Sequence, residues 1–220
     1  MVLPGVLAVT AGFVDAVGFL HLFGVFPANQ SGNLVLLGMA LASPIPPPAW
    51  VSATSIFGFV LGTAGGAWIG GRLRPPVRRR VLLAMELALL VGLAAANAVV
   101  GADRSPLTGA TLGVLLLVAA VAMGIQTEAI RRAAGVAIAT TYETGAMARI
   151  GESLAAAEPG ERRPLRTATA VVLATMVACY VGGAAVGAGR LGQGRAGLVV
   201  PCLAVGAVLV AAWTGDEPDA

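Results

Sequence analysis

Residues 31–42, SGNLVLLGMALA, form an apolar run that is too short to cross a membrane. A helix of this length rises about 18 Å, whereas the hydrocarbon core of a bilayer is about 30 Å thick. The polar stretch FPANQ precedes the run, and serine, here Ser31, is a residue type that caps helix N-termini. Residues 144–155, TGAMARIGESLA, follow the polar stretch ATTYE in the same way, with Thr144 as the expected cap. We therefore predict two half-helices that enter the membrane without crossing it.

Six other runs are apolar and long enough to span a bilayer, which takes about 20 residues. They cover residues 3–23, 50–71, 81–100, 107–126, 167–189 and 197–213. Of the 220 residues, 57% are apolar and 11% are charged, whereas soluble domains average about 25% charged residues. This composition excludes a disordered chain and a nucleic-acid-binding domain. The expected fold is an all-α membrane protein with six transmembrane helices plus two short re-entrant half-helices.

The two short runs belong to a longer internal repeat. Residues 31–42 and 144–155 are identical at four of twelve positions and lie 113 residues apart. A second block supports the repeat, because GGAWIGGRL from Gly65 resembles GGAAVGAGRL from Gly182 at an offset of 117. The order and the spacing of the two blocks are therefore the same in both halves of the chain.

This repeat divides the chain into two membrane domains. Gly12 and Gly124 give a third pair of matching positions, at an offset of 112. We expect a first repeat at residues 1–102 and a second at 103–214, each with three spans and one half-helix, and a short acidic cytoplasmic tail at 215–220. An odd number of spans in each repeat inverts the second repeat relative to the first.

The placement of the 14 basic residues, all of them arginine, distinguishes six spans from eight. With six spans, 11 arginines fall on one side of the membrane and 3 on the other. If the half-helices crossed, the repeats would run parallel and the division would be 9 to 5. Cytoplasmic loops are enriched in arginine, so the more asymmetric six-span topology is favoured, with both termini in the cytoplasm.

Two stretches carry a resemblance to a known family. They are AGFVDAVGFLHLFGVFPANQSGNLVLLG at residues 11–38 and AMGIQTEAIRRAAGVAIATTYETGAMARI at residues 122–150. Their motifs, G-x-x-D-A with a following N-x-[S/T]-G-N, then M-G-x-Q and T-x-x-x-T-G, resemble those of the YoaK family of bacterial multi-pass membrane proteins. The resemblance implies a bacterial inner-membrane location and supplies no established activity. Glu128 and Glu143 depart from the family pattern, which favours smaller or apolar residues there.

Asp15 is the clearest candidate for chemistry, because it lies inside the first expected span. A charged residue at the centre of a transmembrane helix costs about 2.5–3.5 kcal/mol on insertion scales. One interpretation is a proton or cation site, or a contact to a substrate. The other is a structural carboxyl group that accepts hydrogen bonds from a neighbouring helix or from the start of a half-helix.

Polar residues precede and open both expected half-helices. Irregular backbone at membrane depth is tolerated only where it is buried in protein or lines a cavity, and helix N-termini attract negative charge. Half-helices whose starts meet near the midplane are typical of transporters. These residues therefore bind a substrate, or they only cap the two helices. Asp15 and Gln126, the latter from the M-G-x-Q motif, are also candidates for binding a substrate or an ion. The full set of candidate residues is Asp15, Asn29, Ser31, Asn33, Gln126, Thr141, Glu143 and Thr144.

Two more acidic residues lie in or near expected spans. Glu128 precedes Arg131 and Arg132 by three and four positions, so a local ion pair is the simpler interpretation. Glu86 and Asn97 are eleven residues apart and share a helix face. They either line a polar stripe, or Glu86 extends toward the cytoplasmic interface.

Glycines recur every fourth residue in two of the spans, at Gly58, Gly62 and Gly66 and again at Gly183 and Gly187. Small residues at this spacing let transmembrane helices approach closely. We expect these glycines to serve helix packing.

These features together favour a small-solute transporter or permease, coupled to protons or ions through Asp15. A passive channel and a non-transporting membrane partner or assembly protein are the alternatives. No enzyme signature, metal-ligand cluster or cofactor motif is present in the sequence. The expected partners are the lipid bilayer and an unknown small solute or ion, with a possible homo-oligomer and no nucleic acid.

Overall fold

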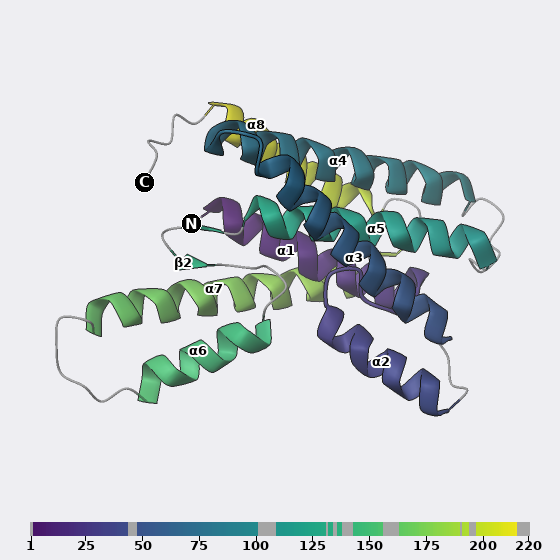
Figure 1. Ribbon diagram of the computed structural model, residues 1–220, viewed down its shortest axis with the longest axis horizontal. Coiled ribbons are helices and arrows are strands. Elements are labelled where there is room, and N and C mark those ends of the chain that lie inside the picture. The colour runs from purple at the N-terminus through teal and green to yellow at the C-terminus, as the bar shows by residue number, and fades with distance from the viewer. Residues whose placement is uncertain are drawn as a thin grey trace.

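The computed structural model describes residues 2–43, 48–100, 109–130, 132–133, 136–137, 143–155, 163–189, 191–193 and 197–214. Within these residues the chain forms a bundle of helices that is elongated along one axis (Figure 1). The longer helices are α1 Val2–Val17, α3 Ala49–Gly70, α4 Pro75–Val100, α5 Gly109–Ala129, α7 Arg163–Ala188 and α8 Val199–Thr214. The predicted helical membrane fold is confirmed at this level.

Three smaller features complete the described chain. A single π-helical turn, Gly18–Leu22, continues α1 without a break. The short helices are α2 Gln30–Ala42 and α6 Glu143–Ala155. Two strands of two residues each, β1 Arg132–Ala133 and β2 Val136–Ala137, pair antiparallel and were not predicted. They are too short to alter the helical class.

Five helical segments are long and apolar enough to cross a membrane: Val2–Leu22, Ala49–Gly70, Pro75–Val99, Gly109–Ala129 and Thr167–Ala188. The sixth expected span, residues 197–213, is not among these five segments. Its helix α8 starts at Val199 and has 16 residues, which corresponds to about 24 Å. Gly197 and Leu198 form a turn instead, and Pro201 lies in the first helical turn, where its missing N–H costs nothing.

The short helices occur where the sequence predicted them. Helices α2 and α6 have 13 residues each, and both their first and last residues are 113 positions apart. Neither predicted residue is the cap, because Ser31 and Thr144 both lie inside the helices. Asn29, with extended backbone, caps α2 by accepting a hydrogen bond from the Gly32 N–H. Thr144 already lies inside α6, which begins at Glu143.

Two helix pairs dominate the packing: α1 lies along α7, and α3 lies along α5 (Figure 1). Gly12 of α1 faces the backbone of Tyr180, and Gly183 of α7 faces the backbone of Val9. At both sites a Cβ atom would collide with a backbone carbonyl group. The predicted packing role of Gly183 is therefore confirmed.

The second pair repeats these contacts. Gly124 of α5 faces the backbone of Phe59, and Gly62 of α3 faces the backbone of Val121. Adding 112 to an α1 residue gives its counterpart in α5, and subtracting 121 from an α7 residue gives its counterpart in α3. The offset of 117 predicted from the Gly65 and Gly182 blocks is therefore wrong by four residues, about one helical turn. Gly66 against Ile125 likewise corresponds to Gly187 against Phe13.

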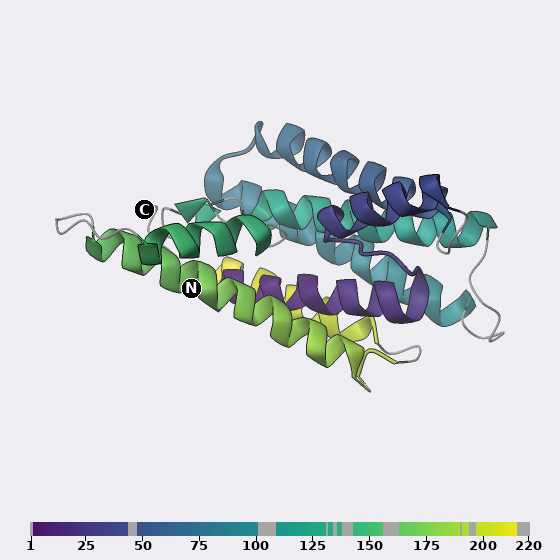
Figure 2. The ribbon, with the colours of Figure 1, turned by 90° about the horizontal axis from the view of Figure 1, so that it is seen from below.

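The directions of the helices follow a matching pattern in Figure 1. Helices α1, α4 and α7 run from the end that carries the N-terminus to the opposite end, and α3, α5 and α8 run back. Helices α2 and α6 start near the middle of the long axis and run to opposite ends, as Figure 2 also shows. Helix α1 thus begins, and α8 ends, at the same end of the bundle.

Arginines and tryptophans mark this end. The Arg80 Nε donates to the Ala212 carbonyl oxygen at 2.8 Å, and its guanidinium lies over the Trp213 ring, 5.1 Å from the centroid. The Arg72 guanidinium lies over Trp68 at 3.6 Å. Such cationic and aromatic groups are typical of a membrane–water interface.

Candidate functional site

Asp15 is buried, with 2% of its surface exposed, and both of its carboxylate oxygens accept hydrogen bonds. Oδ1 accepts from the Ala28 backbone N–H at 2.6 Å, and Oδ2 accepts from the Tyr180 hydroxyl at 2.5 Å. The carboxyl group therefore joins α1 to the segment that precedes α2 and to α7.

Asn33 in the first turn of α2 holds that preceding segment in place. Its Oδ1 accepts from the Phe26 N–H at 3.0 Å, and its Nδ2 donates to the Phe26 carbonyl oxygen at 2.5 Å. The same amide nitrogen donates to Gln30 Oε1 and to Ser55 Oγ, and the Ser55 hydroxyl also donates to the Phe26 carbonyl. Asn33 is fully buried, so this network satisfies irregular backbone inside the bundle.

Asn29 and Ser31 lie at the start of α2 and contact each other. The Ser31 hydroxyl donates to Asn29 Oδ1 at 2.8 Å, and the same oxygen accepts the Gly32 N–H at 3.1 Å. Ser31 is exposed and Asn29 is half-buried. Asp15, Asn29 and Asn33 thus all support the segment that leads into α2.

The second group of candidates is described in part. Thr144 is exposed in the first turn of α6, and Glu143 is the first residue of that helix. Thr141 lies outside the described residues. Gln126 is buried in α5, and its Nε2 donates to the Leu7 carbonyl oxygen of α1 at 2.9 Å. Leu7 precedes Asp15 by eight residues, so this contact lies about 12 Å along the helix from Asp15.

Comparison with known proteins gives the family. Residues 3–211 match the family described as protein of unknown function DUF1275. The chain belongs to this family. The UPF0700 transmembrane protein YoaK of Bacillus subtilis (strain 168) is 30% identical over 155 residues, which cover 69% of this chain and 66% of YoaK. The chain therefore matches slightly less than two thirds of that relative. No solved structure matches the chain.

The predicted resemblance to the YoaK family is thereby confirmed. The family and the apolar helices identify the chain as a multi-pass transmembrane protein of the DUF1275 type. The family description assigns no activity, and the polar residues inside the bundle are the remaining indication of function.

Sequence reasoning missed two members of the Asp15 and Asn33 networks. Tyr180 contacts Asp15 across 165 positions, and Ser55 contacts Asn33 across 22. In the sequence, Tyr180 and Ser55 differ from their apolar neighbours only by carrying a hydroxyl group. Without the helix pairing, nothing indicated which acid or amide they would meet.

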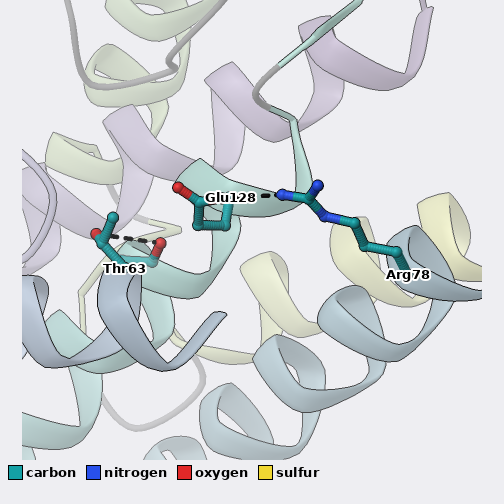
Figure 3. Close-up of polar contacts among 4 residues, drawn as sticks. Thr63, Arg78 and Glu128 are labelled. Atoms are coloured by element: carbon teal, nitrogen blue, oxygen red, sulfur yellow. Dashed lines mark hydrogen bonds and ion pairs between the residues drawn. The ribbon is translucent and has the colours of Figure 1, made fainter. Parts of the chain in front are cut away.

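Glu128 forms an ion pair at the arginine-rich end of the bundle. Its Oε2 lies 3.0 Å from Arg78 Nη2 at the start of α4 (Figure 3). The Glu128 side chain is 3% exposed and that of Arg78 is 34% exposed. The sequence predicted partners at Arg131 and Arg132, whose side chains are not described. The observed partner comes from a different helix, which packs directly against α5, and the pairing with Arg131 or Arg132 stays a prediction.

Glu86 is the second acid inside a long helix, and its environment is apolar. It is fully buried in α4, so the expected alternative that it extends toward the interface is wrong. Neither carboxyl oxygen has a hydrogen-bond partner among the described residues. Asn97, on the same face, is 8% exposed. The described bundle therefore contains one buried acid with two donors, Asp15, and one without any, Glu86.

Proposed function

We propose that this protein is a small-solute transporter of the bacterial inner membrane, built from two inverted repeats of three spans and one re-entrant half-helix. The duplicated glycine contacts, the constant offset of the short helices and their opposite directions support the inversion. Helix α8 would act as the sixth span. A span shorter than the bilayer is accommodated by local thinning or by flanking residues, at a modest cost per ångström.

The proposed orientation places the arginine-rich end in the cytoplasm. Arg72, Arg78 and Arg80 lie at the end where α1 begins and α8 ends. Because arginines are enriched on the cytoplasmic side, both termini would be cytoplasmic.

One observation carries the transport proposal: the segment before α2 lies inside the bundle and ends at a helix N-terminus near mid-length. Val25 and Ala28 of this segment are fully buried, and Asp15 binds the Ala28 N–H. A helix that starts at membrane depth presents free N–H groups and partial positive charge to the interior. In transporters this arrangement binds substrates and coupling ions at the interface between repeats.

The proposed site lies between the N-termini of α2 and α6. Asn29 and Ser31 would contact the solute from the first side, and Thr141, Glu143 and Thr144 from the second. Gln126 would hold α5 against α1 near this site, and Asp15 would bind the coupling ion. Translocation, and not catalysis, is the proposed activity.

Solute uptake into proteoliposomes tests this proposal. A panel of amino acids, sugars, organic acids and nucleobases would be screened with an imposed proton gradient. For a solute that is taken up, we expect Asp15→Asn to abolish acceleration by the gradient while solute exchange persists. Tyr180→Phe, which removes one donor and keeps the carboxyl group, is the matched control and should retain coupling. Coupled uptake that is unchanged in Asp15→Asn would refute the role of Asp15.

A non-transporting membrane partner is the second candidate, and one observation favours it. The side chains of Asp15, Asn29 and Asn33 all bond within the chain. Under this alternative, Asn33→Ala lowers stability and changes no flux, and the protein copurifies with a fixed partner. A passive channel instead predicts flux that neither saturates with solute nor responds to a proton gradient.

A further inference from the structure

Glu86 lies in the middle of α4, on the face that points into the bundle. Eleven residues precede it in the helix and fourteen follow it, so it is roughly 16 Å from one end and 21 Å from the other. Leu82 and Leu83 precede it and Leu90 follows it on this face, and each is at most 1% exposed. Six residues, or about 9 Å along the helix, separate Glu86 from Arg80 at the arginine-rich end, so Glu86 interrupts an apolar stripe about two turns inside that end.

Buried apolar side chains from several helices lie beside this part of α4. Leu83 and Leu90 belong to one buried cluster with residues of three other helices. The cluster members from α1, α5 and α8 are Leu7, Ala11, Val14, Ala122, Met123, Val205, Val208 and Ala212. Figure 1 shows α8 lying against α4 along this stretch. None of these side chains can donate a hydrogen bond to Glu86.

The titratable groups on the packed helices are engaged elsewhere. Asp15 of α1 binds Ala28 and Tyr180, and Glu128 of α5 binds Arg78. Cys202 of α8 donates its S–H to the Leu198 carbonyl oxygen at 3.1 Å. Helix α3 carries no titratable residue. Within α4, Arg80 donates to Ala212, and Arg79 lies seven residues before Glu86, or roughly 10 Å along the axis.

An ionised carboxylate is not stable in such a place. Burying an unpaired charge costs far more than burying a neutral polar group, and the charged form persists only with a partner. Both Glu86 oxygens lack a hydrogen-bond partner among the described residues. The neutral acid avoids most of this cost. Intramembrane acids of this kind mark proton pathways in membrane proteins.

We propose that Glu86 is a proton-exchange site of this protein, separate from Asp15. In the described conformation its carboxyl group holds a proton. When α4 and α8 separate enough to admit water, the O–H bond breaks, the proton passes to water and the carboxylate is hydrated. Proton binding at Glu86 does not depend on transport; if the proposed function holds, Glu86 is a second proton site beside the coupling site at Asp15.

Infrared spectroscopy tests this directly, because a protonated carboxylic acid has a carbonyl stretch separate from that of a carboxylate. The full chain would be reconstituted in phosphatidylethanolamine–phosphatidylglycerol vesicles and titrated from acidic to alkaline pH. We expect a protonated-acid band at neutral pH that is lost at alkaline pH. Glu86→Gln, which resembles the neutral acid in shape, should remove the band completely, and Asp15→Asn should leave it.

Isotope labelling covers the case in which Glu86→Gln does not fold. In the wild-type protein, carboxyl-¹³C glutamate should shift the neutral-pH band, and carboxyl-¹³C aspartate should not. Absence of the band at neutral pH, its persistence in a folded Glu86→Gln variant, or a shift with labelled aspartate would each overturn the proposal. A glutamate band that never responds to pH would also overturn it, because the proton would then not exchange.

The outcome separates this inference from the transport proposal. A pH-dependent Glu86 band in a protein that moves no solute would support the proton site and reject transport. Uptake that responds to the proton gradient, without such a band, would support transport and reject the Glu86 site.

Discussion

The α1–α7 pair and the α3–α5 pair are packed by matching glycine contacts but differ in polar residues. Gly12 and Gly183 in the first pair correspond to Gly124 and Gly62 in the second, each against a backbone carbonyl group. This close approach leaves little freedom for the backbone at either crossing. The two pairs therefore share their geometry.

The polar side chains at matching positions are not shared. The positions that match Asp15 and Tyr180 are Thr127 and Phe59, and the Thr127 hydroxyl donates to the Met123 carbonyl oxygen of its own helix. Conversely, the position that matches Glu128 is Ala16. The glycine packing is thus duplicated, but the charged side chains are not. Any ion binding at the α1–α7 and α3–α5 contacts would therefore differ between the two halves of the chain.

The largest expected effect is a difference in thiol labelling between two equivalent loops, one in each half of the chain. It depends on which side of the membrane each loop lies. In a Cys179→Ala, Cys202→Ala background, single cysteines at Pro46 and Gly160 would be treated with a membrane-impermeant thiol reagent on intact cells. Inverted halves predict labelling at position 46 and none at position 160. Permeabilised cells, in which both sites should react, provide the control. Labelling of both sites, or of neither, in intact cells would mean that the halves are parallel and that the short helices cross.

The next prediction tests whether the α1–α7 and α3–α5 helix pairs are packed equally closely. Gly12→Ala and Gly124→Ala each place a Cβ against a backbone carbonyl, which cannot rotate away. We expect each to destabilise the protein by about 3 kcal/mol, at the upper end of typical overpacking costs. Thermal unfolding in detergent micelles would measure this.

A matched control is available in α4. Nothing lies within 4 Å of a Cβ added at Gly92, so Gly92→Ala should be neutral or stabilise the helix by about 0.5–1 kcal/mol. If only one of the two crossing variants were destabilised, the two pairs would not be equivalent.

The sequence alone predicted most of the helices and both short ones, because these follow from apolar run length and from polar lead-ins. The 113-residue offset between α2 and α6 was visible in SGNLVLLGMALA and TGAMARIGESLA. The start of α8 was predicted two residues too early, because apolar composition continued through Gly197 while the backbone formed a turn. Apolar composition indicates that a segment lies in the membrane, but it does not determine the residue at which the helix begins.

The partners of the polar residues were not predictable in the same way. Asp15 meets Tyr180, and Glu128 meets Arg78, only because the helices pair as α1–α7 and α4–α5. Apolar spans give little signal for which helix packs against which, since every face is hydrophobic. Asn29 as the cap of α2 could have been found, because asparagine is as good a cap as serine.

Removal of the Asp15 carboxyl group is expected to have a smaller effect than the glycine substitutions. Asp15→Ala leaves the buried Ala28 N–H without this acceptor and the Tyr180 hydroxyl without its partner, which costs about 2 kcal/mol. Thr127→Val at the matching position should change stability by less than about 0.5 kcal/mol. Thermal unfolding of both variants checks this asymmetry. Equal losses would show that the Asp15 network does not distinguish the first half.

The smallest effect concerns the Arg78–Glu128 ion pair, which also occurs in one half only. The Arg78 side chain is 34% exposed, so solvent screens the pair, and we expect a coupling of about 0.5–1 kcal/mol. A double-mutant cycle of Glu128→Gln and Arg78→Gln in micelles isolates this term from the other contacts of each residue. The coupling should shrink at high salt, because Arg78 is partly exposed to solvent.

A larger, salt-independent coupling would mean that lipid or protein shields the pair from solvent. Strict additivity of the two substitutions would mean that the arginine-rich end gains nothing from this contact. In that case the charge asymmetry between the halves would reside in Asp15 and Glu86, and the arginines would contribute orientation in the membrane and not stability.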